Sequence, residues 1–222
     1  MTGEATIPHS MLVQPNVPAS LELAMIGNCA ISALIDERAS IVWCCMPRFD
    51  STPAFDALIN SHGERPAEGA MTVEIEDFAR AEQSYDGGTA IVRTRLWDKR
   101  GAEIEISDFA PRFINRDRVF RPSQLVRRVR PISGNPRVRF AVRPRANWGM
   151  MAPVLTCGSN HLRYVLPDYT LRLNTSVPLT YLVDNTWFTL DKPLSLLLGP
   201  DETLIGSVDE TAREFEEQTE SY

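Results

Sequence analysis

Alternation of apolar and polar positions is the main pattern in the middle of the chain. Residues 71–75, 89–97 and 102–109 each place apolar side chains at every second position. Successive side chains of a strand point to opposite faces, so this period predicts strands with one buried face. Asp86-Gly87-Gly88 supplies a tight turn after residues 81–85, because glycine reaches positive φ without steric cost. We therefore expect residues 81–85, 89–97 and 102–109 to form three strands in meander order.

Short apolar runs separated by turn residues recur after Pro153. Many short strands at regular spacing favour a β-sandwich over an alternating α/β arrangement. The expected strands are residues 154–157, 161–166, 170–174, 179–183, 187–190 and 194–198.

Near the end of the chain, the spacing of apolar residues changes from that of a strand to that of a helix. Ser207 and Glu210 match a capping box, in which both side chains satisfy backbone N–H groups of the first helical turn. Val208, Ala212 and Phe215 follow at i, i+4 and i+7, which places them on one helix face. We expect a helix from Ser207 onward.

The N-terminal part combines a predicted hairpin with a stiff polar loop. Residues 29–35 and 41–46 are apolar, and the break of turn length between them predicts two paired strands. Pro47 ends the second strand, because proline has no N–H to donate to a sheet. The loop Arg48-Phe49-Asp50-Ser51-Thr52-Pro53 then presents a cation, an aromatic ring and a carboxylate between two prolines.

Five groups of residues in this part carry a family resemblance: Ile26-Gly27-Asn28, Ala33-Leu34-Ile35-Asp36, Ile41-Val42-Trp43, Pro47-Arg48-Phe49-Asp50-Ser51 and Phe55. The pattern resembles the opening of the prokaryotic glycoside hydrolase family 15 proteins, which include glucoamylases, glucodextranases and trehalase-like enzymes. It departs from them at Cys29-Ala30-Ile31 and Cys44-Cys45. The resemblance implies an all-β fold, a large two-sheet antiparallel β-sandwich (supersandwich, galactose-mutarotase-like) with a C-terminal linker helix.

A division of the chain follows from the residues and the resemblance together. Residues 1–20 place prolines among small and polar residues, and we expect a disordered tail there. Residues 21–206 would form the sandwich, and residues 207–222 the start of a linker helix toward a catalytic (α/α) barrel. A chain of 222 residues has no room for that barrel as well.

The resemblance also implies a reaction and its partners. Family members hydrolyse α-glucosidic bonds with inversion, using two glutamates on the barrel. We therefore assign no catalytic residue to this chain, and we expect it to be inactive on glycosides by itself. The implied partners are the C-terminal barrel of the same protein and the α-glucoside or oligosaccharide substrate of the full-length enzyme. No cofactor is implied.

Arg48, Phe49, Asp50 and Trp148 are the candidates for contact with substrate or with the barrel. In the full-length protein, Arg48 would donate to sugar hydroxyls and Asp50 would fix its orientation. The alternative is a structural Arg48–Asp50 ion pair that pins the loop, with Phe49 packed beneath. Trp148 lies in a predicted loop, whereas Trp43 stands among core-type residues and is expected to be buried.

Charge is unevenly distributed along the chain. The net charge is −6, yet residues 112–145 hold 11 arginines and one acid, which gives +10 and leaves −16 elsewhere. In residues 137–143 the arginines occupy one face of a predicted strand. Arginine pairs bidentately with carboxylates, and few aromatic residues stand near for base stacking. We expect pairing within the protein or with a neighbouring domain, rather than nucleic-acid binding.

The four cysteines and three histidines show no metal-ligand spacing, and we expect buried, reduced thiols and no metal. No stretch has the roughly 20 consecutive apolar residues of a membrane helix, and residues 1–20 do not read as a secretory signal. We expect a cytoplasmic protein that does not bind membranes.

Three other functions compete with the supporting-domain interpretation. The first is a free-standing carbohydrate-binding module. The second is a self-sufficient enzyme on a mutarotase-like sandwich, which would need a histidine and an acid converging in a cleft. The third is nucleic-acid binding through the arginine face. An apolar patch left bare by a missing barrel would also favour a homo-oligomer.

Overall fold

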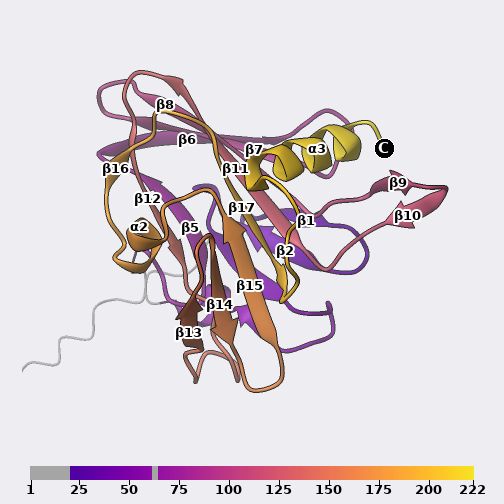
Figure 1. The fold of residues 1–222 in the computed structure, drawn as a ribbon. Helices are drawn as coiled ribbons and strands as arrows, with labels where there is room; N and C mark the ends of the chain where they lie inside the picture. Colours follow the sequence, from indigo (N-terminus) through magenta and orange to yellow (C-terminus); the bar gives the residue numbers. More distant parts are fainter. Residues whose placement is uncertain (1–20, 62–64) are drawn as a thin grey trace, which may run out of the picture.

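Two antiparallel sheets form the body of the protein (Figure 1), and a computed structural model describes residues 21–61 and 65–222 of it. Every strand pairing within these residues is antiparallel. The predicted two-sheet antiparallel β-sandwich is therefore confirmed. The expected disordered tail, residues 1–20, lies outside the described residues.

One sheet has seven strands and the other has eight. The seven-stranded sheet has the order β1 (Ala24–Gly27), β2 (Ser32–Ile35), β3 (Ile41–Cys45), β5 (Met71–Ile75), β12 (Arg137–Val142) and β16 (Phe188–Thr189), with β4 (Pro53–Phe55) paired to β3. The eight-stranded sheet has the order β13 (Val154–Cys157), β14 (His161–Val165), β15 (Thr170–Thr175), β17 (Leu194–Pro200), β11 (Leu125–Ser133), β8 (Glu103–Phe109), β7 (Val92–Asp98) and β6 (Phe78–Tyr85).

The main core lies between the two sheets. In β8, Ile104 and Ile106 face this core, whereas Phe109 belongs to a second cluster on the outer side of the sheet. In β11, Leu125 and Val129 likewise face the core. The alternation in the sequence predicts these faces, because a strand turns successive side chains to opposite sides.

A buried ion pair crosses this core. Arg127 shares the inward face of β11 and pairs bidentately with Asp108 of β8, with Nε–Oδ1 2.6 Å and Nη2–Oδ2 3.0 Å. The same guanidinium donates to the carbonyl oxygens of Met71 in β5 and Ala39 in the β2–β3 turn, at 3.1 and 2.6 Å. Arg127 therefore joins the two sheets, and its charge is both paired and hydrogen-bonded, as burial requires.

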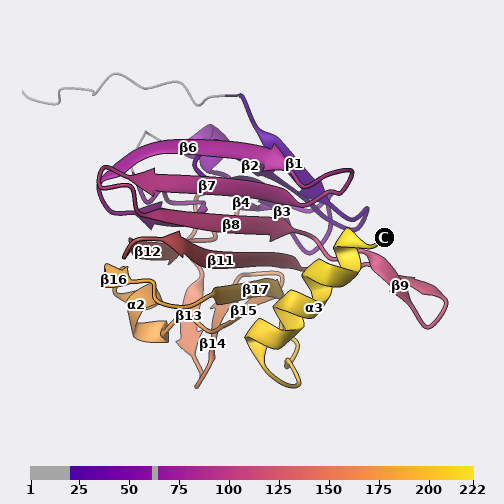
Figure 2. The ribbon, with the colours of Figure 1, turned by 90° about the horizontal axis from the view of Figure 1, so that it is seen from above.

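Helix α3 (Val208–Glu220) lies across the outer face of the eight-stranded sheet (Figure 2). Val208 and Ala212 pack on Val126 and Leu197, as the helical spacing predicts. The Ser207 side chain accepts a hydrogen bond from the Glu210 N–H at 3.4 Å, which is the N-cap half of the predicted box.

Glu216 attaches the middle of this helix to the sheet. It is buried and forms ion pairs with Arg93 of β7 and Arg128 of β11. The sequence pattern did not indicate this contact, because a glutamate on an acidic helix is expected to face water.

Seven of the arginines in residues 112–145 pair with carboxylates inside the chain. The expectation of pairing within the protein is confirmed for these seven. The pairs are Arg127–Asp108, Arg128–Glu216, Arg130–Glu105, Arg137–Glu76, Arg139–Glu74, Arg143–Glu68 and Arg145–Glu68.

One segment that the sequence predicted as a strand forms a helix in the structure. Residues 179–183 form α2 (Leu179–Val183), preceded by Pro178 at φ −53°. Leu182 is buried and Leu179 packs against the same core, so the buried positions are three residues apart rather than two. A spacing of three fits a helical turn, and the fixed φ of proline suits its start. The prediction of a strand here is wrong.

The expectation of buried thiols is wrong for two cysteines. Cys44 is buried and Cys45 is half-buried, but Cys29 and Cys157 are exposed. Cys29 sits in the β1–β2 turn at φ 68°, and Cys157 ends β13, a strand whose residues are all exposed. β13 forms the edge of its sheet, which explains the exposure.

Candidate functional site

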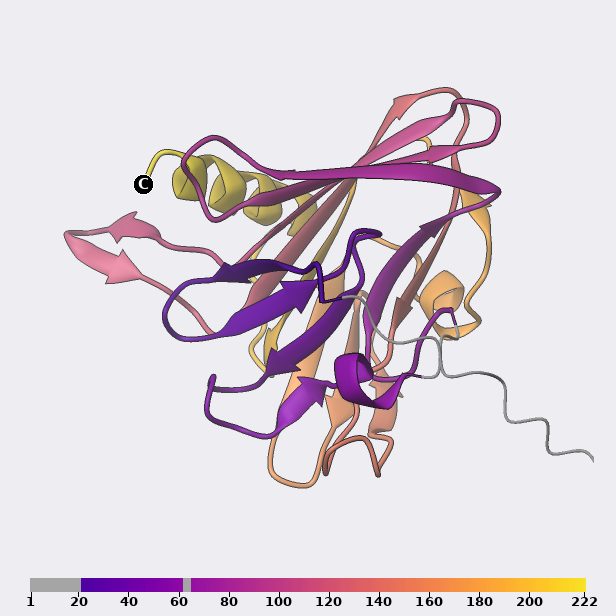
Figure 3. The same ribbon diagram turned by 180° about the vertical axis from the view of Figure 1, so that it is seen from behind.

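Three segments meet where the Arg48 loop leaves the sandwich. Figure 3 shows the β3–β4 turn and α1 (Ala57–Asn60), both purple, in the lower half of the view. The segment after β12 joins them, because the Arg145 N–H donates to the Ala54 carbonyl oxygen at 2.8 Å. The Asn60 side chain also donates to the Trp148 carbonyl oxygen at 3.1 Å. The structure therefore brings the predicted Trp148 loop against β4 and α1.

The Trp148 loop is a closed turn with unusual backbone angles. Ala146 and Met151 bridge its ends, and Asn147 and Trp148 have φ values of 50° and 56°. The Gly149 carbonyl oxygen accepts from Arg145 Nε and Nη2 at 3.2 and 3.1 Å. Non-glycine residues at positive φ are uncommon and are held by their surroundings. These contacts hold Trp148 in one position.

Trp148 is 53% exposed and lies beside Trp43 of β3. The ring centroids are 6.2 Å apart and the rings are tilted by 46°, an ordinary geometry for an aromatic pair. Trp43 is only half-buried, so the expectation that it lies in the core is wrong. The pair leaves an aromatic surface open to solvent, which can stack on the apolar face of a sugar ring.

Asp56 lies beneath this loop and is fully buried. Its Oδ2 accepts from Asn60 Nδ2 at 3.0 Å, and its Oδ1 has no hydrogen-bond partner among the described residues. Burial raises the pKa of Asp56, opposed by the Asn60 hydrogen bond and the charge of Arg145. Asn60 donates to both Asp56 and Trp148, so Asp56 helps to position the loop.

The Arg48 loop carries an exposed ion pair. Arg48 Nε and Nη2 donate to the two Asp50 carboxylate oxygens at 2.8 and 3.0 Å, and Ser51 N–H donates to the Arg48 carbonyl oxygen at 3.1 Å. The carboxylate raises the pKa of Arg48, and the guanidinium lowers the pKa of Asp50. Phe49 is 62% exposed, so the expected packing of Phe49 beneath the pair is wrong.

The predicted site residues form two groups rather than one. Within the described residues, no hydrogen bond, ion pair or ring contact joins Arg48, Phe49 or Asp50 to Trp148. The link between the groups is β3, which carries Trp43 and leads into the Arg48 loop.

Trp97 and Trp187 belong to neither group. Arg80 lies over the Trp97 ring and Arg139 lies over the Trp187 ring, at 3.5 and 4.6 Å from the ring centroids. Trp97 and Trp187 are therefore not part of the aromatic surface formed by Trp43 and Trp148.

Asp56, Asn60 and Arg145 were not predicted as site residues. Asp56 and Asn60 are four residues apart, a spacing that brings two side chains together on a helical turn. That spacing is the one local signal for the pair. Their contact with Trp148 spans 88 residues of sequence, and no local pattern indicates it.

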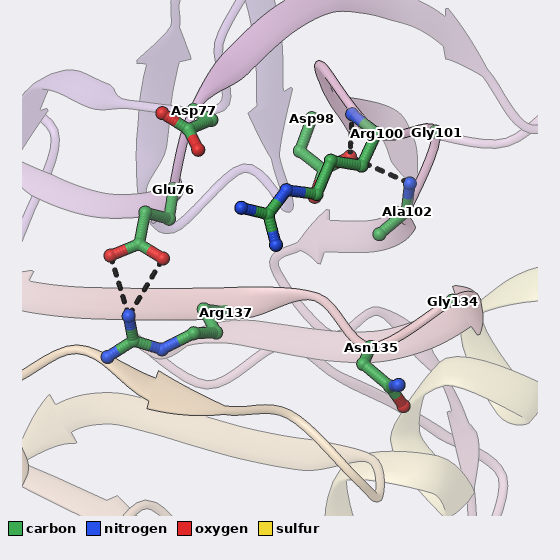
Figure 4. A pocket seen from close by; sticks show the side chains of 9 residues that line it. All are labelled: Glu76, Asp77, Asp98, Arg100, Gly101, Ala102, Gly134, Asn135 and Arg137. Carbon is green, nitrogen blue, oxygen red and sulfur yellow. Dashed lines mark hydrogen bonds and ion pairs between the residues drawn. The ribbon is translucent and has the colours of Figure 1, made fainter.

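A polar hollow of about 270 Å³ lies elsewhere, among strand turns (Figure 4). Arg137 Nη1 donates to both carboxylate oxygens of Glu76 at 2.8 Å, and Asp98 accepts from the N–H groups of Arg100 and Ala102 in its own turn. These acids are therefore engaged in the fold. No aromatic side chain lines the hollow, and we assign it no role.

Neither a metal centre nor a membrane-spanning helix is found in the parts of the chain that are described. No three His, Cys, Asp or Glu side chains among residues 21–61 and 65–222 group as metal ligands would. No helix in the same residues is long and apolar enough to span a bilayer.

Comparison with known proteins gives one family and one relative. The family model described as "Trehalase-like, N-terminal" matches residues 12–177. A protein named Trehalase 1 from Sulfolobus acidocaldarius is 29% identical over 149 residues, which is 65% of this chain and 23% of the relative. The chain thus aligns with about a quarter of that relative's length. No solved structure matches significantly. Because the family model covers most of the chain, this protein belongs to the trehalase-like N-terminal domain family.

Proposed function

We propose that this chain is the non-catalytic N-terminal β-sandwich domain of a family-15-like glycoside hydrolase. In this proposal a C-terminal (α/α) barrel of the same polypeptide hydrolyses an α-glucosidic bond with inversion, and the sandwich supports that barrel. The observation that carries the proposal is the match to an N-terminal domain family over residues 12–177. The name of the relative, Trehalase 1, favours a trehalose-like α-glucoside as substrate.

The environment of the acids near the candidate site supports a non-catalytic role. Inverting hydrolysis needs one protonated acid and one base, with carboxyl groups roughly 6.5–9.5 Å apart to admit a water. Asp50 is engaged by Arg48, and Asp56 is fully buried beneath the Trp148 loop. Neither carboxylate is free to activate a water on a bound sugar, so we assign both catalytic acids to the barrel.

Arg48, Phe49, Asp50 and Trp148 are proposed to face the barrel or its substrate. The exposure of all four side chains supports this proposal. The Arg48 guanidinium keeps donors that Asp50 does not use, which suits sugar hydroxyls. The Trp148 ring offers a stacking surface.

A comparison of the full-length protein with the 222-residue chain tests this function. The full-length protein is expected to hydrolyse trehalose or maltooligosaccharides and to release β-glucose, which proton NMR detects at early times. The 222-residue chain is expected to show no turnover. Equal turnover by the short chain would contradict the proposal.

A free-standing carbohydrate-binding module is the second candidate. The exposed Trp148 ring beside Trp43 favours it. Calorimetric titration of the 222-residue chain with maltooligosaccharides and trehalose separates the two functions. A binding module gives at least millimolar affinity that Trp148→Ala removes, whereas a supporting domain gives little or no heat.

A further inference from the structure

The hairpin of β9 (Phe113–Asn115) and β10 (Arg118–Phe120) belongs to neither sheet of the sandwich. It projects from the body beside the end of α3 (Figures 1 and 2). Arg116 and Asp117 form its turn with φ values of 51° and 60°, as in the tight turns that suit β-hairpins. A lone two-stranded hairpin is marginally stable in water, so contacts on its faces decide whether it persists.

One face of the hairpin is covered by α3. The rings of Phe113 and Phe120 are opposite each other in the register, with centroids 4.9 Å apart. Both pack against Phe215 of α3, at 5.7 and 5.6 Å. This aromatic cluster fixes the hairpin to the helix.

The other face is apolar and bare. Ile114 and Val119 are directly opposite each other in the register, and they are 56% and 46% exposed. Strand residues alternate between faces, so this pair points away from Phe113 and Phe120. Single exposed apolar residues are ordinary, whereas here two lie side by side across the strands of a projecting hairpin.

The hairpin and the residues beside it also carry positive charge that has no carboxylate partner among the described residues. Among the described residues, Arg112, Arg116, Arg118 and Arg121 form no ion pair with a carboxylate, whereas the seven later arginines of residues 112–145 all do. Asp117 is the one acid within residues 112–121. A partner with carboxylates around an apolar patch would match this surface.

The position of Tyr222 indicates which partner would cover the bare face of the hairpin. Arg112 lies over the ring of Tyr222 at 5.3 Å, so the end of α3 lies at the base of the hairpin. The β3–β4 turn, which carries the Arg48 loop, is on the same side of the molecule (Figure 3). A domain that follows Tyr222 would meet the hairpin first.

We propose that the bare face of the β9–β10 hairpin, Ile114 and Val119 with Arg116 at the turn and Arg121 just after β10, docks the domain that follows Tyr222 in the full-length polypeptide. The docked surface is apolar with carboxylates at its rim. This inference rests on the proposed function, because it requires a further domain in the same chain.

Hydrogen exchange read by mass spectrometry tests the docking. Amides of residues 113–120 are expected to exchange at least about tenfold more slowly in the full-length protein than in the 222-residue chain. Amides of β13 serve as the reference, because β13 is another exposed strand. Equal exchange of the hairpin in the two proteins overturns the proposal.

Charged substitutions in the full-length protein give a second readout that does not require the short chain. Ile114→Asp/Val119→Asp is expected to speed exchange in the hairpin and also in a surface of the following domain. Ile132→Asp/Ile205→Asp, at exposed apolar positions outside the hairpin, should leave that domain unchanged. Loosening of the hairpin alone, or equal effects of both variants, overturns the docking.

The two proposals fail in different ways. A full-length protein that hydrolyses α-glucosides but leaves the hairpin unprotected contradicts the docking and retains the function. A full-length protein without glycosidase activity contradicts the function, even where the hairpin is protected. Retention of the full-length protein by DNA or anionic vesicles through these arginines, with no hairpin protection, assigns the surface to another partner and also overturns the docking.

Discussion

The domain contains two Arg–Asp pairs with nearly the same geometry in opposite environments. Arg127–Asp108 has side-chain exposures of 1% and 0%, whereas Arg48–Asp50 has 71% and 54%. Both pairs are bidentate, with N–O distances between 2.6 and 3.0 Å. Geometry therefore does not distinguish their roles. Burial does, because water screens the exposed pair and replaces its hydrogen bonds when it opens.

The partners beyond the pair reinforce this difference. The Arg127 guanidinium also holds the carbonyl oxygens of Met71 and Ala39, which lie on the other sheet and its turn. The further contacts of Arg48 and Asp50 stay within their own loop. The inner pair thus stabilises the sandwich, and the outer pair is available for recognition.

The largest effect is expected from breaking the inner pair. Asp108→Ala should lower the free energy of unfolding by about 3–5 kcal/mol, because it leaves the Arg127 charge buried and unpaired. Urea unfolding followed by circular dichroism measures it. The double variant Arg127→Met/Asp108→Leu is the matched control. Its loss of unfolding free energy should be smaller than the sum of the losses for Arg127→Met and Asp108→Leu. A loss below about 1 kcal/mol for Asp108→Ala would contradict the role given to this pair.

An ion pair of intermediate burial sharpens the comparison. Glu216 is buried, and its partners Arg93 and Arg128 keep some access to water. Glu216→Ala should lower the free energy of unfolding by about 1–3 kcal/mol, because two guanidinium groups lose a partner but can be hydrated. Glu214→Ala, at an exposed position of the same helix, is the control. A larger loss of unfolding free energy than that of Asp108→Ala would contradict the ranking of the ion pairs by burial.

Gly149 tests whether the Trp148 region is held as firmly as its contacts indicate. A Cβ at Gly149 would lie 2.5 Å from Asn60 Nδ2 and 2.7 Å from Asp56 Oδ2, at φ 88°. Gly149→Ala should cost about 2 kcal/mol of unfolding free energy. Gly101→Ala is the matched control, because Gly101 has φ 86° and nothing within 4 Å of the added Cβ. It should cost about 1 kcal/mol, from backbone strain alone. Equal costs would mean that Asn60 and Asp56 do not restrain the loop.

The smallest effect on stability is expected at the outer pair. Arg48→Ala should leave the urea midpoint of the full-length protein close to that of the wild type, because both partners are exposed. Its turnover of α-glucosides should fall, since the proposal gives Arg48 a contact with sugar or barrel. Lys99→Ala, at an exposed turn position, is the control for both readouts. Unchanged turnover at unchanged stability would remove Arg48 from the site.

The parts of the fold that follow a local period could be predicted from the sequence. Ile104 and Ile106 alternate with acids and lie in a predicted strand, and the spacing of Val208 and Ala212 predicted α3. Leu125, Arg127 and Val129 stand at every second position, and this alternation alone puts them on one strand face. Its partner Asp108 and the Met71 and Ala39 carbonyl groups come from distant segments, so no local pattern could show that this arginine is neutralised inside the core.

The candidate site likewise has features that the sequence could predict and features that it could not. Arg48 and Asp50 are two residues apart in a proline-bracketed loop, and their pairing was one of the two alternatives that the sequence offered. The exposure of Phe49 could not be predicted, because an aromatic ring in a loop can turn either inward or outward. Asp56 and Asn60 remained unrecognised, since their role depends on a segment 88 residues away.

A direct test of the central claim, that burial separates the stabilising pair from the pair proposed for recognition, compares Asp108→Asn and Asp50→Asn in the full-length protein. Unfolding free energy and α-glucoside turnover are measured on the same samples. The account predicts a large loss of stability for Asp108→Asn, and a loss of turnover at wild-type stability for Asp50→Asn. Similar losses of stability in the two variants, or full turnover in Asp50→Asn, would contradict it.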